Sequence, residues 1–149
     1  MALLGNSVDS VHGRLAWTRS IEEKLGVRIP FPIIADLDTR VARAYGMLHP
    51  NTSVTAAVRA VFVIDPEQTV RAVLYYPMNA GWMIPEILRL VNALRTSDRD
   101  GVSCPANWRR GGDAVLGAPK TWAELDARLA DGTVKLADWY LATKPGTPA

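Results

Sequence analysis

The chain has 149 residues, a formal net charge of +2 and 48% hydrophobic residues, which is typical of a globular chain with a sizeable core. The near-neutral charge contains no block of like sign, which argues against a strongly basic nucleic-acid-binding surface. No apolar run reaches the ~18–20 residues of a membrane span, so neither nucleic acid nor a membrane is expected as a partner.

The N-terminal region predicts a strand followed by a helix. Residues 2–8 form a short apolar stretch suited to a strand, and the apolar residues of 11–25 recur with a roughly helical period. Asp9 or Ser10 is placed to cap this helix at its N-terminus, and Gly26 is placed to end it.

A second strand and a short helix are predicted next. Within residues 29–36, two prolines accompany β-branched residues, which suits a short strand at a loop exit. Asp38 or Thr39 can cap the helix that follows, and Gly46 can stop it. Residues 47–55 are rich in turn-forming types and predict a loop.

Residues 58–77 contain two apolar runs joined by a polar turn at 65–68, the pattern of an antiparallel hairpin. The first run, residues 58–64, is apolar except for Arg59, although such a composition predicts a strand that is buried on both faces. From the residues alone, the favoured interpretation of Arg59 is an arginine at a strand start that reaches solvent or pairs with a carboxylate, and a functional role is the alternative. A helix over about 84–94 is predicted after the hairpin.

The pattern changes at residues 96–101, after which proline, glycine and tryptophan become frequent. Residues 96–149 are therefore predicted to form an irregular arm with little core of its own. Within this arm, residues 121–129 predict a short helix that begins with a capping box of Thr121 and Glu124. The last residues are expected to form one hairpin or an extended strand.

The predicted order is βαβαββα, which indicates an α/β fold and fits the second half of a thioredoxin-like sheet. Periodicity alone does not separate this fold from other α/β sandwiches. Residues 1–95 are predicted to be the C-terminal part of a thioredoxin-like core, and residues 96–149 a C-terminal arm used for dimerisation.

Six blocks of the sequence occur in one order and together resemble the one-cysteine peroxiredoxins, the peroxiredoxin-6-like class of the AhpC/TSA superfamily. These blocks are NSVDSVHGRLAWTRSIEE, PFPIIADLDTRVARAYGML, VRAVFVIDPEQTVRAVLYYP, PEILRLVNAL, CPANW and WYLATKP. The resemblance implies a partial thioredoxin-like fold and a thiol peroxidase activity, in which a cysteine attacks a hydroperoxide and the resulting sulfenic acid is reduced by an external thiol. It also implies a hydroperoxide substrate, a thiol reductant and a homodimer or association with an intact peroxiredoxin.

By this resemblance, Arg59 matches the family arginine that lies beside the active site and supports catalysis. An arginine can lower the pKa of a thiol and hold peroxide oxygens through its planar guanidinium. In the loop that follows the hairpin, Trp82 stands where the family usually has an arginine, so a second supporting charge is not expected.

The family's peroxidatic cysteine lies in a proline–x–x–x–threonine–x–x–cysteine block, upstream of all six blocks and not found in residues 1–149. The sequence therefore predicts a truncated peroxiredoxin that is inactive alone, and leaves open whether it is an enzyme. The alternatives are a non-catalytic dimerisation or interaction module, and a product without a stable fold. In the family sheet, one absent strand lies between residues 2–8 and the hairpin, so an apolar sheet edge is expected to be open.

The remaining candidate residues are expected to have structural roles. Cys104, the one cysteine, cannot form an intramolecular disulfide and is expected to pack beneath the arm; a redox-active or peroxidatic role is the alternative. His12 and His49 have no cysteine, serine or acidic residue at a spacing that indicates a catalytic pair. Trp108 and Trp139 are expected at a dimer interface. No metal and no cofactor are predicted, and without a signal peptide the expected location is cytoplasmic.

Overall fold

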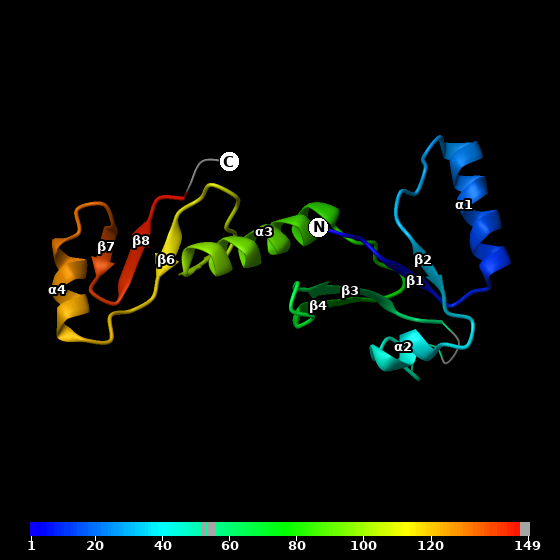
Figure 1. Cartoon of the computed structure of the whole chain (residues 1–149), viewed down its shortest axis with the longest axis horizontal. Helices are drawn as coiled ribbons and strands as arrows, with labels where there is room; N and C mark the ends of the chain where they lie inside the picture. Colours follow the sequence, from blue (N-terminus) through cyan, green and yellow to red (C-terminus); the bar gives the residue numbers. More distant parts are fainter. Residues whose placement is uncertain (52, 54–55, 147–149) are drawn as a thin grey trace. The chain divides into compact units, whose positions relative to one another are not determined.

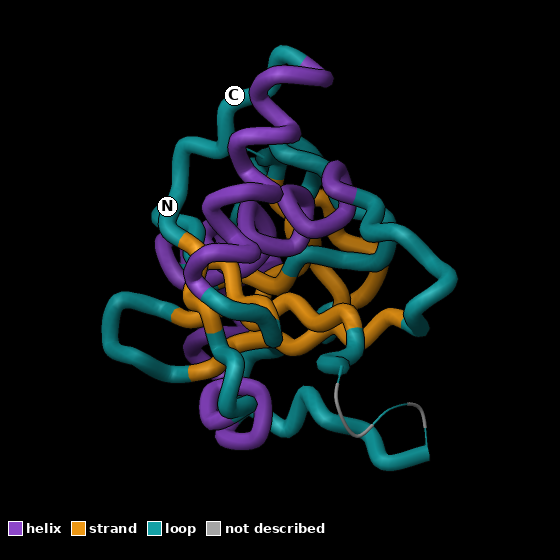
Figure 2. Tube along the Cα trace, turned by 90° about the vertical axis from the view of Figure 1, so that its right-hand side faces the viewer, coloured by secondary structure: helices purple, strands orange, loops and turns teal. Residues whose placement is uncertain are grey.

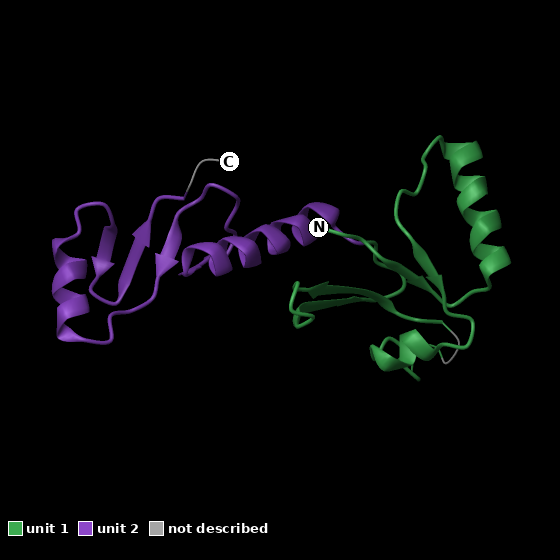
Figure 3. Ribbon diagram, in the orientation of Figure 1, with its two compact units in different colours: residues 1–81 green, residues 82–149 purple. Residues whose placement is uncertain are grey.

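The computed structural model describes residues 1–146 apart from 52, 54 and 55. It divides the chain into two units, Met1–Gly81 and Trp82–Ala149 (Figure 3). Their elements run in the order β1-α1-β2-α2-β3-β4 and α3-β5-β6-α4-β7-β8, respectively (Figure 1). Loops connect these short elements throughout (Figure 2). The predicted order βαβαββα is therefore confirmed, whereas the boundary between residues 95 and 96 stays a prediction.

The first unit contains two separate sheets of two strands each. β1 and β2 pair in parallel, with Gly5 opposite Ile33, and β3 and β4 pair antiparallel, with Arg59 opposite Tyr76. The elements of this unit are β1 (Gly5–Ser7), α1 (Val11–Leu25), β2 (Ile33–Ala35), α2 (Arg40–Ala44), β3 (Arg59–Ile64) and β4 (Val70–Tyr76).

Helix α1 has the bounds that its sequence predicts, because both ends are specified locally. The Ser10 hydroxyl accepts a hydrogen bond of 3.0 Å from the N–H of Gly13 and so caps the first turn. At the other end, Gly26 has a left-handed φ of 66° and donates its N–H to the Glu22 carbonyl, which ends the helix. Of the two candidate N-caps, Ser10 is therefore the correct one.

The β3–β4 hairpin also forms as predicted. Gln68 donates its N–H to the Asp65 carbonyl at 3.0 Å, which closes the turn, and Asp65 donates its N–H to the Thr69 carbonyl at 3.0 Å. Gln68 has a φ of 65°, the left-handed conformation that a bulged three-residue hairpin loop requires.

The first unit buries little of its apolar surface. Its buried residues among those described are Ala42, Met47, Val58 and Asp36, and all six residues of β3 are partly or largely exposed. The expectation that residues 58–64 are buried on both faces is therefore wrong for this chain. β3 has the composition of a central strand, but among the described residues it pairs with β4 alone.

The second unit is more regular than the predicted arm. It contains a four-stranded antiparallel sheet in the order β5-β6-β8-β7, in which Ala114 pairs with Lys144 across 30 residues of chain. Local periodicity does not reveal such pairing, because the partners are distant in sequence. Its elements are α3 (Ile84–Asp100), β5 (Val102–Ser103), β6 (Ala114–Leu116), α4 (Trp122–Ala130), β7 (Lys135–Asp138) and β8 (Leu141–Lys144).

Trp108 lies inside this unit, with 5% of its surface exposed, and its indole N–H donates to the Gly112 carbonyl at 3.0 Å. The expectation that Trp108 lies at a dimer interface is therefore wrong, because its own unit already buries the side chain. Trp139, by contrast, is 47% exposed.

Both helices of the second unit begin close to their predicted starts. α3 continues beyond residue 94 to Asp100, where Gly101 ends it with a φ of 62°. In α4, the Thr121 hydroxyl accepts from the Glu124 N–H, while the Glu124 carboxylate accepts from the N–H of Lys120 rather than that of Thr121.

Over the described part of the chain, no helix is long and apolar enough to cross a bilayer.

Candidate functional site

Arg59 is the first residue of β3 and is half-buried. Its Nε–H donates a hydrogen bond of 3.0 Å to the carbonyl of Met78, in the loop that follows β4. This bond fixes the plane of the guanidinium, because Nε lies in the same rigid fork as the terminal nitrogens. The arginine is therefore held at the end of the hairpin rather than extended into bulk solvent.

The loop beyond Met78 brings no second arginine to this position. Ala80 donates its N–H to the Pro77 carbonyl at 3.0 Å, which forms a tight turn, and Trp82 is 43% exposed. Arg71 of β4 lies 3.5 Å from the Asp65 carboxylate, at the opposite end of the hairpin from Arg59. In the described part of this loop, the Met78 carbonyl holds a cation through its hydrogen bond from Arg59.

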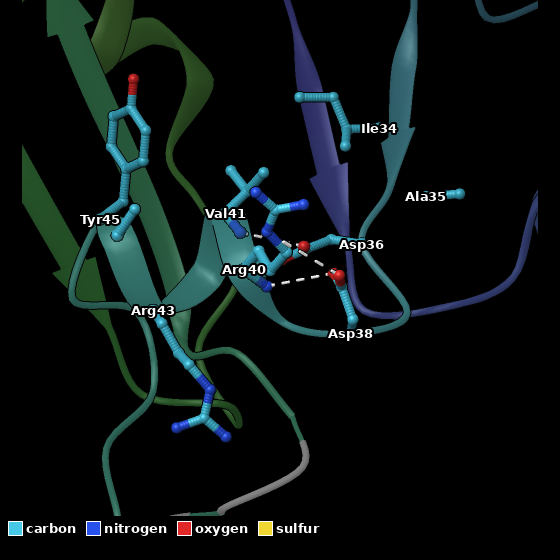
Figure 4. A pocket seen from close by; sticks show the side chains of 9 residues that line it. Ile34, Ala35, Asp36, Asp38, Arg40, Val41, Arg43 and Tyr45 are labelled. Atoms are coloured by element: carbon cyan, nitrogen blue, oxygen red, sulfur yellow. Dashed lines mark hydrogen bonds and ion pairs between the residues drawn. The ribbon is translucent and has the colours of Figure 1, made fainter.

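A shallow hollow of about 680 Å³ lies where β2 meets α2 (Figure 4). Its charged groups are engaged with the protein itself: the Asp36 carboxylate accepts from the N–H groups of Val41 and Ala42 at 3.0 and 2.7 Å. Asp38 accepts from the N–H of Arg40 at 3.3 Å. The carboxylates that line the hollow therefore serve to cap the start of α2. With five residues, α2 is too short to form an anion-binding site of its own.

Asp36 is the residue that sequence reasoning missed. It is 3% exposed and also accepts a hydrogen bond of 3.5 Å from the Asn6 side chain, so it joins β1, β2 and α2. Burial opposes the charged form, but the donors at Ala42, Val41 and Asn6 together lower the pKa of the Asp36 carboxyl below its ordinary value. Asp38 and Thr39 were predicted as caps; the Thr39 side chain makes no capping bond.

Cys104 lies in the second unit, directly after β5. Its thiol lies 3.5 Å from the Ala93 carbonyl, to which it can donate, and it is partly buried. Burial raises the pKa of the Cys104 thiol; Arg89 opposes this rise and Asp100 adds to it. A peroxidatic cysteine requires the opposite shift, so these surroundings favour the predicted packing role.

The two histidines belong to the first unit, whereas Cys104 belongs to the second. His12 is exposed on α1, and the ring of His49 lies 5.3 Å from that of Tyr75. Across the described residues, no group of three or more metal-binding side chains occurs.

Comparison with known proteins places the two regions in one family. The AhpC/TSA family matches residues 1–73, and the C-terminal domain of 1-Cys peroxiredoxin matches residues 93–130. Among relatives, the peroxiredoxin of Aquifex aeolicus is 44% identical over 152 residues, covering 95% of this chain and 68% of that protein. Peroxiredoxin 2 of Caldanaerobacter subterraneus is 48% identical over 143 residues, covering 95% of this chain and 65% of its own length.

Solved structures agree with this assignment. A yeast mitochondrial 1-Cys peroxiredoxin matches with a TM-score of 0.83 and 31% identity over 97% of this chain and 70% of that one. A cysteine-to-serine mutant of peroxiredoxin 6 from Arenicola marina matches with a TM-score of 0.83 and 27% identity, covering 99% of this chain and 71% of its own. The fold is thus a thioredoxin-like α/β fold. The chain belongs to the peroxiredoxin family, in its one-cysteine class, and spans about two thirds of the length of the relatives named here.

Proposed function

We propose that this chain contributes the peroxide-stabilising arginine and the C-terminal arm of a one-cysteine thiol peroxidase. The substrate class is a hydroperoxide, reduced by a cysteine thiolate that an external thiol regenerates. The observation that carries the proposal is the position of Arg59 at the start of β3, with Nε bound to Met78. A guanidinium held in this way can stabilise both a thiolate and the developing charge on the leaving peroxide oxygen.

The sulfur nucleophile is proposed to come from a segment without counterpart in residues 1–149. Cys104 does not replace it, because burial raises the pKa of its thiol, whereas a peroxidatic cysteine requires a lowered pKa. The 149-residue chain by itself is therefore expected to show no peroxidase turnover.

The test compares three proteins in a peroxide-consumption assay. The 149-residue chain and its Cys104→Ser variant should both be indistinguishable from buffer. A fusion that places the unmatched segment of Aquifex aeolicus peroxiredoxin before Met1 should consume peroxide. In that fusion, Arg59→Gln should lower the rate of peroxide consumption about 10²–10³-fold. The rate of Arg59→Lys should lie between those of the unsubstituted fusion and Arg59→Gln, because lysine keeps the positive charge but lacks the planar guanidinium.

Arg71→Gln is the matched control, since Arg71 lies in the same hairpin and pairs with Asp65 instead. Equal losses for Arg59→Gln and Arg71→Gln would remove the catalytic role of Arg59. Turnover by the 149-residue chain that disappears in Cys104→Ser would overturn the claim of inactivity.

We also propose that the arm mediates a homodimer, or association with an intact peroxiredoxin. The support is a set of exposed aromatic side chains in the second unit, with Trp122 at 81%, Tyr140 at 53% and Trp139 at 47% exposure. Light scattering on the same samples reports the oligomeric state. A cytoplasmic location stays a prediction.

A further inference from the structure

The chain contains four methionines, and their side chains differ widely in accessibility. Met1 is 83% exposed, Met83 64%, Met78 46% and Met47 8%. A hydroperoxide can convert a thioether sulfur that it reaches into a sulfoxide. Exposure alone therefore ranks Met78 third among the four as a target of oxidation.

Met78 lies in a turn that also holds Arg59. Its carbonyl accepts the Nε–H of Arg59 at 3.0 Å, and the turn is closed by the N–H of Ala80, which donates to the Pro77 carbonyl at 3.0 Å. These two bonds fix the backbone of Met78, while its side chain remains accessible to solvent. The thioether sulfur is only a few bonds away from the carbonyl that binds the guanidinium.

The bond to Met78 uses one N–H group of a rigid fork that carries several. In the proposed function, this guanidinium stabilises the charge that develops on the leaving oxygen of a hydroperoxide. Methionine is unbranched and adapts its conformation easily. A hydroperoxide held by Arg59 is therefore within reach of the sulfur of Met78.

We propose that Met78 is a site of oxidation by hydroperoxides and that Arg59 directs the reaction to it. The sulfur lone pair attacks the outer peroxide oxygen, so that an S–O bond forms while the O–O bond breaks. The hydroperoxide proton moves to the leaving oxygen, which departs as an alcohol, or as water from hydrogen peroxide. The sulfur is oxidised by an electron pair, and the peroxide is reduced by the same pair.

Each chain takes up a single oxygen atom at Met78 and then stops, so this reaction is not peroxidase turnover. The inference rests on the proposed role of Arg59, but it requires no cysteine. It can therefore be tested on the 149-residue chain itself.

The probe is tert-butyl hydroperoxide, and mass spectrometry of peptide fragments reports the sulfoxide at each methionine over time. Chloramine-T oxidises thioethers without an O–O bond to polarise, so its rates measure accessibility. The ratio of the peroxide rate to the chloramine-T rate should be larger at Met78 than at Met83 and Met1. Met47 should stay reduced while the chain is folded, because its side chain is buried. A ratio at Met78 no larger than that at Met83 would overturn the proposal.

Arg59→Gln removes the guanidinium, so the peroxide rate at Met78 should fall at least about tenfold, with no change at Met1. A merely structural role predicts the opposite sign, because loss of the bond to the Met78 carbonyl would loosen the turn and expose the sulfur. Arg71→Gln is the matched control, since Arg71 pairs with Asp65 at the other end of the hairpin. An unchanged or raised rate in Arg59→Gln, or an equal fall in Arg71→Gln, would overturn the proposal.

Met78→Leu keeps an apolar side chain of similar size and should remove the first oxygen that the intact chain takes up; unchanged uptake would reject the site. Oxidation of Met78 that depends on Arg59, together with an inactive fusion to the Aquifex aeolicus segment, would support the methionine site and reject the peroxidase proposal. An active fusion that depends on Arg59, together with oxidation that follows exposure alone, would do the reverse.

Discussion

Replacing Trp108 by alanine tests whether this residue is the core of the second unit. The side chain is 5% exposed and its indole N–H binds the Gly112 carbonyl at 3.0 Å. Truncating a buried tryptophan to alanine costs about 3–5 kcal/mol, because apolar contacts are lost and a cavity is left. At about 0.05–0.15 kcal/mol per residue, a unit of this size has a total stability of only about 3–10 kcal/mol.

Trp108→Ala is therefore expected to remove most of the stability of residues 82–149. Trp108→Phe keeps an aromatic ring and loses the hydrogen bond, so it should cost about 1–2 kcal/mol. Leu129→Ala is the matched control in the same unit: Leu129 is 58% exposed and is not one of the aromatic residues of the proposed dimer surface, so its loss should cost less than about 0.5 kcal/mol.

The assay is guanidinium denaturation of the full chain followed by far-UV circular dichroism, since indole fluorescence changes with the substitutions themselves. Hydrogen exchange of residues 102–116 assigns the loss to the second unit. A cost for Trp108→Ala of less than about 1 kcal/mol, or no larger than that of Leu129→Ala, would show that Trp108 does not hold this unit together.

Two further predictions concern titrating groups. Because burial raises the pKa of the Cys104 thiol, its reaction with iodoacetamide at pH 7 should be slower than that of free cysteine and should accelerate only toward alkaline pH; a rate equal to or above that of free cysteine contradicts a packed thiol. The Asp36 carboxyl has a lowered pKa in the folded chain, so its stabilising effect is present above about pH 4 and is lost as pH falls through the folded value. The difference in unfolding free energy between wild type and Asp36→Asn should therefore shrink on acidification, and a difference that is constant between pH 3 and pH 7 would contradict this account.

Features set by short stretches of sequence were predictable. Helix α1 has the expected bounds because Ser10 and Gly26 act within one turn of its ends. The β3–β4 hairpin is likewise specified by the local turn at Asp65–Gln68. The peroxiredoxin resemblance, which rested on six ordered blocks, is confirmed by the family matches and the solved structures.

Features that depend on residues far apart in the chain were not predictable in this way. The pairing of β6 with β8, the burial of Trp108 and the contacts of Asp36 with Asn6 and α2 are examples. Local periodicity contains no information about which distant backbone or side-chain groups will meet.

By itself, the sequence determined the family, the order of elements and the candidate arginine, because each is written in contiguous residues. Only the tertiary structure decided that β3, a strand with the composition of a core strand, pairs with a single neighbour in the part of the chain that the structure describes. Composition determines how strongly a strand gains from burial, whereas the presence of a neighbour depends on which other segments are there to pair with it.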